Sequence, residues 1–261
     1  MLNAVHKKIS MIGRYVIESV WQAGLLVRFF VLLLRYSGTC LLRPRLVIRE
    51  IYFSGFFSLI VIMICGLFVG MILGYQGYDI LQRFASAEAT GMMVAVSVGR
   101  ELGPVMTALL FASRAGSAIT SEIGLMKTTE QISALDMMAV NPLARVAAPR
   151  FWGGVISMPF LSAFFTAMAI FGGYLVVVGA IGVDANAYWS QTAGAVNWSV
   201  DFGKGFIKSF VFGIVVTLIA VFEGYEAHPT AEGVSVATTR TIVKSALAIL
   251  GFDFVMTVFL F

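Results

Sequence analysis

The chain has 261 residues, of which 59% are hydrophobic and only 12% are charged, and its mean hydropathy is +0.91. Because soluble domains carry about 25% charged residues, this composition excludes an ordinary soluble domain and indicates an integral membrane protein. The net charge of +4 is small, and no interleaving of basic and exposed aromatic residues predicts nucleic-acid binding.

Residues 1–49 are predicted to form a cytoplasmic N-terminus with an interfacial helix. Residues 1–16 are basic and lack a compact apolar run followed by a small-residue cleavage site, so no cleaved signal is expected. Within this N-terminal region, residues 15–42 are apolar but are interrupted by Glu18, Arg28 and Arg35. The two arginines are seven residues apart and therefore share one helical face. This pattern favours an amphipathic helix in the membrane interface over a membrane span.

Five later segments are long and apolar enough to cross a hydrocarbon core, which requires about 20 residues. Two of them, residues 51–78 and 151–183, contain no charged residue. The other three, residues 90–120, 202–222 and 242–261, each contain charged residues. The sequence therefore predicts an all-α membrane protein with one transmembrane domain over residues 50–261 and about five transmembrane helices.

Lysine and arginine residues are distributed unevenly among the predicted loops. Eight precede residue 51, and the loop after the second span adds three more: Lys7, Lys8, Arg14, Arg28, Arg35, Arg43, Arg45 and Arg49, then Lys127, Arg145 and Arg150. This asymmetry predicts a cytoplasmic N-terminus and, with five spans, a periplasmic C-terminus. Residues 223–239 fit poorly, because this expected cytoplasmic loop contains three glutamates.

Small residues recur every four positions in the first two spans, as Gly66, Gly70 and Gly74 and as Ala108, Ala112 and Gly116. Such spacing lets helix backbones approach closely in lipid. It predicts close helix contacts, either within the bundle or between two copies of the chain.

Charged residues inside the spans are the most informative feature. Arg100, Glu101, Lys208 and Asp253 fall at a similar depth in the predicted outer half of the membrane. Intramembrane charges are costly and usually face a partner or a cavity. Two interpretations remain open: mutual pairing, for example Glu101 with Lys208, or a polar patch that receives an anionic headgroup, for which arginine is well suited.

An apolar stripe lies at the outer end of the first span. Its members recur at three- and four-residue spacing, near Tyr75 and Tyr78: Leu73, Gly77, Ile80, Leu81 and Phe84. The stripe continues past the expected membrane exit, as a path for an amphiphile would require. Ordinary helix packing explains the same spacing.

The cytoplasmic loop between the second and third spans predicts a short helix over residues 129–140. Thr128 and Gln131 have the spacing of a capping box, with Thr128 as N-cap and Gln131 at the third helical position. Ile132, Leu135 and Met138 then form an apolar face, and Asn141-Pro142 ends the helix. With Met137 and Met138 exposed, this helix is typical of a docking element.

Motifs of soluble enzymes are absent from the sequence. No Walker loop occurs, so ATP hydrolysis by that route is excluded for this chain. Glu223, Glu226 and His228 are the closest approach to a metal site, but they lack the helical spacing of zinc ligands, and a solvated loop is the favoured interpretation.

The sequence resembles the MlaE family, the permease subunits of an ATP-binding-cassette (ABC) system that moves phospholipid between the membranes of Gram-negative bacteria. The likeness runs from about residue 49 to the C-terminus. It rests on seven stretches: residues 70–78 (Gly-Met through Gln-Gly-Tyr), 100–104 (Arg-Glu-Leu-Gly-Pro), 114–118 (Arg-Ala-Gly-Ser-Ala), 122–126 (Glu-Ile-Gly-Leu-Met), 129–131 (Thr-Glu-Gln), 149–152 (Pro-Arg-Phe-Trp) and 237–241 (Ala-Thr-Thr-Arg-Thr).

The resemblance implies an assembly in the inner membrane: a permease homodimer with two cytoplasmic ABC ATPases, a STAS-domain accessory subunit and a periplasmic hexamer of MCE-domain subunits. ATP and magnesium would bind the ATPase, and no cofactor is expected on this chain. Coupling to the ATPase is assigned by resemblance to Thr129, Glu130, Leu135, Asp136 and Met138. Lipid binding is assigned to Leu73, Tyr78, Ile80, Leu81, Phe84, Arg100, Glu101, Lys208 and Asp253.

A competing hypothesis is an ion- or proton-coupled carrier that uses Glu101, Lys208 and Asp253 as relay groups. An odd number of spans without an inverted repeat argues against the usual carrier designs.

Overall fold

A computed structural model describes residues 2–38, 44–195 and 202–260, and every regular element in these ranges is a helix. Five helical stretches are long and apolar enough to cross a membrane: Pro44–Gln82, Ala87–Thr128, Leu143–Ala180, Gly203–Glu226 and Ala231–Leu260. The predicted all-α architecture with five spans is thus confirmed. Each helix extends further at its predicted cytoplasmic end than the apolar run that identified it, because charged residues continue the helices there.

The individual helices are α1 (Leu2–Tyr36), α3 (Pro44–Ile51), α4 (Phe57–Gln82), α5 (Thr90–Ser97), α6 (Gly103–Phe111), α7 (Ser117–Thr128), α8 (Gln131–Met137), α9 (Ala148–Tyr174), α10 (Ala185–Ala195), α11 (Gly203–Glu226) and α12 (Ala231–Leu260). The first span combines α3 and α4, and the second combines α5, α6 and α7. Wide, π-helical turns join these pieces, at Tyr52–Phe56, Val98–Leu102 and Ala112–Gly116.

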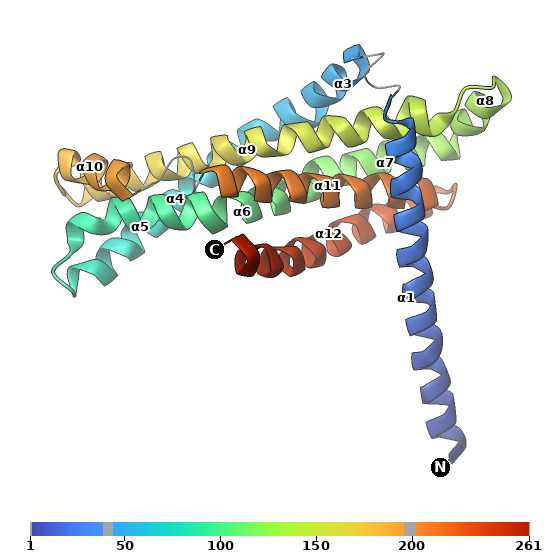
Figure 1. Cartoon of the computed structure of the whole chain (residues 1–261), viewed down its shortest axis with the longest axis horizontal. Coiled ribbons are helices and arrows are strands. Elements are labelled where there is room, and N and C mark those ends of the chain that lie inside the picture. Colours follow the sequence, from blue (N-terminus) through green and yellow to red (C-terminus); the bar gives the residue numbers. More distant parts are fainter. Residues whose placement is uncertain (1, 39–43, 196–201, 261) are drawn as a thin grey trace.

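The spans run along the long axis of the bundle (Figure 1). One end carries α8 and the turn between α11 and α12, and the opposite end carries α10 and the turn between α4 and α5. Helix α1 lies across the first of these ends, roughly perpendicular to the spans. This is the direction that a helix in the plane of the membrane interface would take.

Helix α1 attaches to the bundle through one apolar face. Leu33 is completely buried, and Leu26, Phe29 and Phe30 pack on the same hydrophobic cluster. The Phe29 ring lies 5.7 Å from the rings of both Phe222 and Tyr225 of α11. Spacings of three, four and seven residues place these side chains on one helical face.

The glycines of the first span form a contact within the chain, against α9. A Cβ at Gly66 would lie 2.8 Å from the Phe165 carbonyl oxygen, and one at Gly70 would overlap the backbone of Ala169. On α9, a Cβ at Gly172 would overlap the backbone of Leu67 in the same way. The two helices therefore meet backbone to backbone, and this small-residue stripe is used inside the bundle.

At the opposite end, α10 is held against the bundle by Tyr188. Its side chain is fully buried, and its hydroxyl donates a hydrogen bond to the Ile170 carbonyl at 3.0 Å. Burial raises the pKa of Tyr188 to about 12, because the phenolate would lose its hydration. The tyrosine thus stays neutral and keeps its donor at physiological pH.

Candidate functional site

A buried cluster of charges joins three spans. Lys208 of α11 is fully buried, and its Nζ lies 2.7 Å from Glu101 Oε2 of the second span and 2.6 Å from Asp253 Oδ1 of α12. The same Nζ donates a hydrogen bond to the Thr257 hydroxyl at 2.9 Å. Sequence analysis had left pairing of Glu101 with Lys208 as one of two alternatives, and the structure contains that pair.

Two features of the sequence bring this cluster together. Glu101 lies in the wide turn Val98–Leu102, which interrupts the regular helix just before Gly103. Gly205, three residues before Lys208, packs against the Gly99 carbonyl, since a Cβ there would lie only 2.7 Å from the carbonyl oxygen. The missing side chain lets α11 approach the turn closely enough for the lysine to reach the carboxylate.

The cluster is asymmetric in exposure. The Lys208 side chain is 0% exposed, whereas those of Glu101 and Asp253 are 37% and 22% exposed. A single enclosed cation therefore holds two carboxylates that reach the edge of the bundle. Arg100, next to Glu101, is half-buried.

The apolar stripe on the first span divides into two parts. Leu73 packs on the hydrophobic core, and Gly77 is buried against Met93. Further out, Leu81 is half-buried, Ile80 is 49% exposed, and Phe84 is 74% exposed just beyond the end of α4. Tyr78 is also half-buried. The inner part is thus packing surface, and the outer part is an apolar wall that this chain leaves partly uncovered.

Helix α8 lies in the predicted loop, but the capping prediction for it was wrong. The helix spans Gln131–Met137 with Glu130 as its N-cap residue, in a left-handed conformation with φ 57° and without a side-chain cap. Thr128 still belongs to α7, and its hydroxyl donates to the Leu125 carbonyl. The helix also ends before Asn141, whose side chain instead accepts a hydrogen bond from the Leu143 backbone.

One face of α8 is anchored and the other is free in the described chain. Ile132 and Leu135 pack on the hydrophobic cluster beneath α1 and α11. Asp136 is exposed, and the exposed fractions of Met137 and Met138 are 89% and 64%. Exposed methionines beside an anchored face are typical of an adaptable protein-binding surface.

The acidic loop expected at residues 223–239 is mostly helical, which corrects that prediction. Helix α11 continues to Glu226, and α12 begins at Ala231. Glu223 is buried, and its carboxylate accepts a 2.5 Å hydrogen bond from Lys244 Nζ of α12. Lys244 also donates to the Gln22 side chain of α1 at 3.3 Å. Sequence reasoning missed this pair, although opposite charges in consecutive spans were the available signal.

A second ion pair at the same end links the second and third spans. Arg150 donates to Glu122 at 3.1 Å and lies 4.0 Å from Glu50 of α3. Across residues 2–38, 44–195 and 202–260, no group of three or more His, Cys, Asp or Glu side chains could hold a metal ion. Three acidic residues at this end, Glu50, Glu122 and Glu223, have an ion-pair partner.

Five candidate membrane spans among the described residues, with a charge cluster in the bundle and an exposed helix at one end, define a multi-pass membrane protein. The family model for the MlaE permease matches residues 47–259, so the chain belongs to the MlaE permease family.

Relatives in three groups of organisms agree with this assignment. The intermembrane phospholipid transport system permease protein MlaE of Haemophilus influenzae is 55% identical over 216 residues, 83% of each chain. A probable ABC transporter permease of Rickettsia typhi is 31% identical over 97% of each chain. The chloroplast protein TRIGALACTOSYLDIACYLGLYCEROL 1 of Arabidopsis thaliana is 30% identical over 78% of this chain and 58% of its own length. As an ABC permease, the chain is the membrane subunit, and ATP hydrolysis belongs to a separate partner.

Proposed function

We propose that this chain is the permease subunit of an ATP-driven transporter that moves phospholipids between the inner and outer membranes and so maintains outer-membrane lipid asymmetry. The observation that carries the proposal is the 55% identity with the Haemophilus permease, whose name states intermembrane phospholipid transport. The buried charges and the apolar wall of α4 give this chain features suited to an amphiphile.

The proposed lipid site lies at the bundle end that carries α10, between the outer part of α4 and the charge cluster. Ile80, Leu81 and Phe84 would contact the acyl chains, with Tyr78 beside them, whereas Leu73 packs on the core behind this wall. Because Lys208 is enclosed between two carboxylates, we assign first contact with the phosphate to Arg100, whose planar guanidinium matches phosphate oxygens. Lys208 would hold Glu101 and Asp253 in position around this site.

The proposed assembly is a homodimer with a cytoplasmic ABC ATPase, which binds ATP and magnesium, a STAS-domain subunit and a periplasmic MCE-domain hexamer. Two exposed surfaces support a multi-subunit state. Exposed aromatic side chains line α12, at Phe252, Phe254 and Phe259, and exposed methionines lie on α8. An exposed apolar face on a membrane span, as on α12, can contact another helix or lipid. An exposed apolar face outside the spans, as on α8, can contact a protein partner.

Leu81→Glu is expected to remove the phospholipid bound at the proposed transport site and so to lower the amount of phospholipid recovered with the purified complex. The substitution puts a charge on the wall that would contact acyl chains, which gain about 0.8 kcal/mol for each buried methylene. Arg100→Ala should lower lipid recovery only in part, because tails supply most of the affinity, and should weaken the outer-membrane barrier. Phospholipid is measured by extraction and mass spectrometry. A normal lipid load on Leu81→Glu protein would restrict the stripe to helix packing.

Helix α8 is expected to bind the ATPase. Met137→Asp and Met138→Asp together should reduce recovery of the ATPase by more than tenfold in a detergent pull-down, because both side chains are exposed and each change places a charge in the proposed contact. Ser133→Asp, which adds one charge at another exposed position of the same helix, serves as the comparison for each of the two single variants. Undiminished recovery with the double variant would exclude this helix from the interface; the neighbouring Thr129, Glu130 and Asp136 would then lose their assigned role.

The proposed orientation places the N-terminus and α8 in the cytoplasm and α10 and the C-terminus in the periplasm. In a background with Cys40 and Cys65 replaced by serine, a cysteine at Ala185 should react with a membrane-impermeant reagent in intact spheroplasts. A cysteine at Glu130 should react only after the membrane is permeabilised. The reverse labelling pattern would invert every inside and outside assignment made for the chain.

A further inference from the structure

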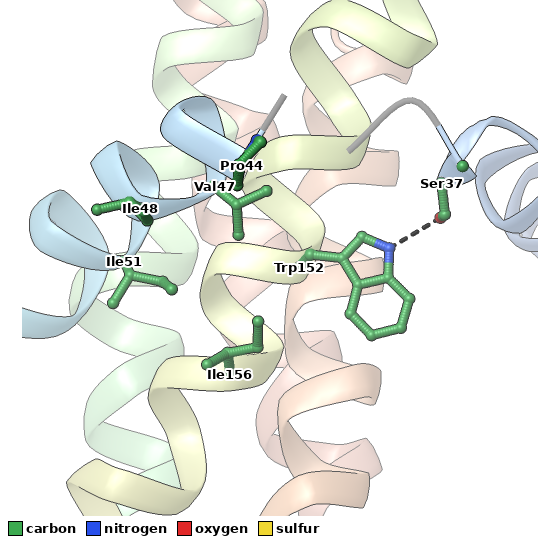
Figure 2. Close-up of a pocket in the computed structure, with 8 residues that line it drawn as sticks. Ser37, Pro44, Val47, Ile48, Ile51, Trp152 and Ile156 are labelled. Carbon is green, nitrogen blue, oxygen red and sulfur yellow. Dashed lines mark hydrogen bonds between the residues drawn. The ribbon is translucent and has the colours of Figure 1, made fainter. Parts of the chain in front are cut away.

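An apolar pocket lies away from the charge cluster, where the end of α1 meets the beginnings of the first and third spans (Figure 2). Its volume is about 520 Å³. Helix α3 supplies a row of lining residues, Pro44, Val47, Ile48 and Ile51, and α9 supplies Trp152 and Ile156. Ser37, at the end of α1, closes one side by accepting a 2.8 Å hydrogen bond from the Trp152 indole nitrogen.

The α3 row matches the direction and scale of an acyl chain. The lining positions repeat at three, four and seven residues, so they form one strip along the helix. Seven residues of helix rise about 10 Å, against about 15 Å for the hydrocarbon half-thickness of a bilayer. The pocket is accessible from outside the chain, since its lining residue Ile48 is 63% exposed.

Cations flank this strip on the same helix. Arg45 and Arg49 each follow a lining residue, Pro44 and Ile48, and are four positions apart, so they form a parallel row; both are exposed. Arg49 also lies over the Phe53 ring, with 5.7 Å between its Cζ and the ring centroid. An apolar strip beside a cationic row at the start of a membrane span complements a phospholipid, with chains in the strip and phosphate at the arginines.

We propose that this pocket binds one acyl chain of a phospholipid of the surrounding leaflet, whose anionic headgroup pairs with Arg45 and Arg49. This lipid would fill the junction of α1, α3 and α9 and would stay bound rather than be transported. The site lies at the bundle end that carries α8, whereas the proposed transport site lies at the other end (Figure 1). The proposal therefore does not depend on the proposed function.

The test uses a phosphatidylglycerol that carries a photoreactive diazirine midway along one acyl chain. It is incorporated into membranes that contain the full chain, the protein is purified in detergent to remove bulk lipid, and the sample is irradiated. Labelled peptides are then mapped by mass spectrometry. Adducts should concentrate on residues 44–51 and 152–156, at least fivefold above those at Ile60, which is 59% exposed on the same span.

Two pocket-filling variants, Ile156→Trp and Ile48→Trp, should each lower the pocket adduct at least fivefold, while Ile60→Trp should leave it unchanged. Arg45→Gln combined with Arg49→Gln should remove the preference for phosphatidylglycerol over phosphatidylcholine. Leu81→Glu should not alter this labelling, which separates the pocket from the transport site. Adducts spread evenly over the exposed spans, or unchanged in both tryptophan variants, would overturn the proposal.

Discussion

Replacing Gly70 with leucine is expected to prevent the chain from folding. At Gly70 a Cβ alone would overlap the Ala169 backbone, so any side chain forces α4 and α9 apart. Overpacking a well-packed core lowers the free energy of unfolding by about 1–3 kcal/mol. We expect a loss at or above the upper end of this range, because the backbone of Ala169, unlike a flexible side chain, cannot move aside. We expect loss of the monodisperse peak in size-exclusion chromatography of the detergent-solubilised protein.

Gly70→Ala is a smaller change at the same position, because it adds only the overlapping methyl group. It should clearly lower the melting temperature of the protein. Gly179→Ala is the matched control, since no atom lies within 4 Å of a Cβ at that position. It should behave as wild type. A Gly70→Leu protein with normal elution and melting would contradict the backbone contact between α4 and α9.

Replacing Lys208 with methionine is expected to destabilise the protein and to abolish transport. The variant keeps most of the side-chain volume but leaves Glu101 and Asp253 close together without their cation. Removing one partner of a buried ion pair costs about 3–5 kcal/mol, and we expect the lower end because both carboxylates are partly exposed. The melting temperature in detergent and the outer-membrane barrier in cells are the two measurements.

A triple variant separates the structural role of the cluster from its role in transport. Lys208→Met, Glu101→Gln and Asp253→Asn together remove all three charges, and replacing a complete buried ion network is often close to neutral for stability. We expect the triple variant to regain most of the melting temperature while transport stays impaired. Normal transport by the triple variant would limit the charges to holding the spans together.

The spans were predictable from the sequence because lipid leaves only one solution for a long apolar segment, a helix that satisfies its own hydrogen bonds. The predicted spans were short by several residues at the ends that are predicted to be cytoplasmic. There, charged residues such as Glu122 and Arg150 continue the helices by pairing across spans, whereas a criterion based on apolar length ends a span where charged residues become frequent.

The candidate site was predictable only in part. Similar depth in the membrane brought Glu101, Lys208 and Asp253 to attention, but their mutual contacts depend on the rotation of α11 and α12 about their axes. The wide turn at Glu101 has no clear sequence signature. The error at α8 has a different cause: Thr128 and Gln131 have the spacing of a capping box, but that local pattern does not reveal that α7 continues through Thr128.

The lipid pocket beside α1 escaped sequence reasoning for a related reason. Its lining residues come from the end of α1 and from α3, which are close together in the chain, and from α9, about a hundred positions further on. In the sequence, each of these apolar residues is indistinguishable from any other apolar residue of a membrane helix. Only the crossing of α1 over the two spans, visible in Figure 1, brings them around one cavity.

Phospholipid movement by the purified assembly tests the central claim most directly. The complex is isolated through a tag on this chain, reconstituted into liposomes with a fluorescent phospholipid, and transfer of that lipid to acceptor vesicles is followed with and without ATP. The account predicts that an ATPase subunit co-purifies with the chain and that transfer requires hydrolysable ATP. A chain that purifies without an ATPase and supports an ATP-independent proton or ion flux, with no lipid transfer, would contradict it and identify an ion-coupled carrier.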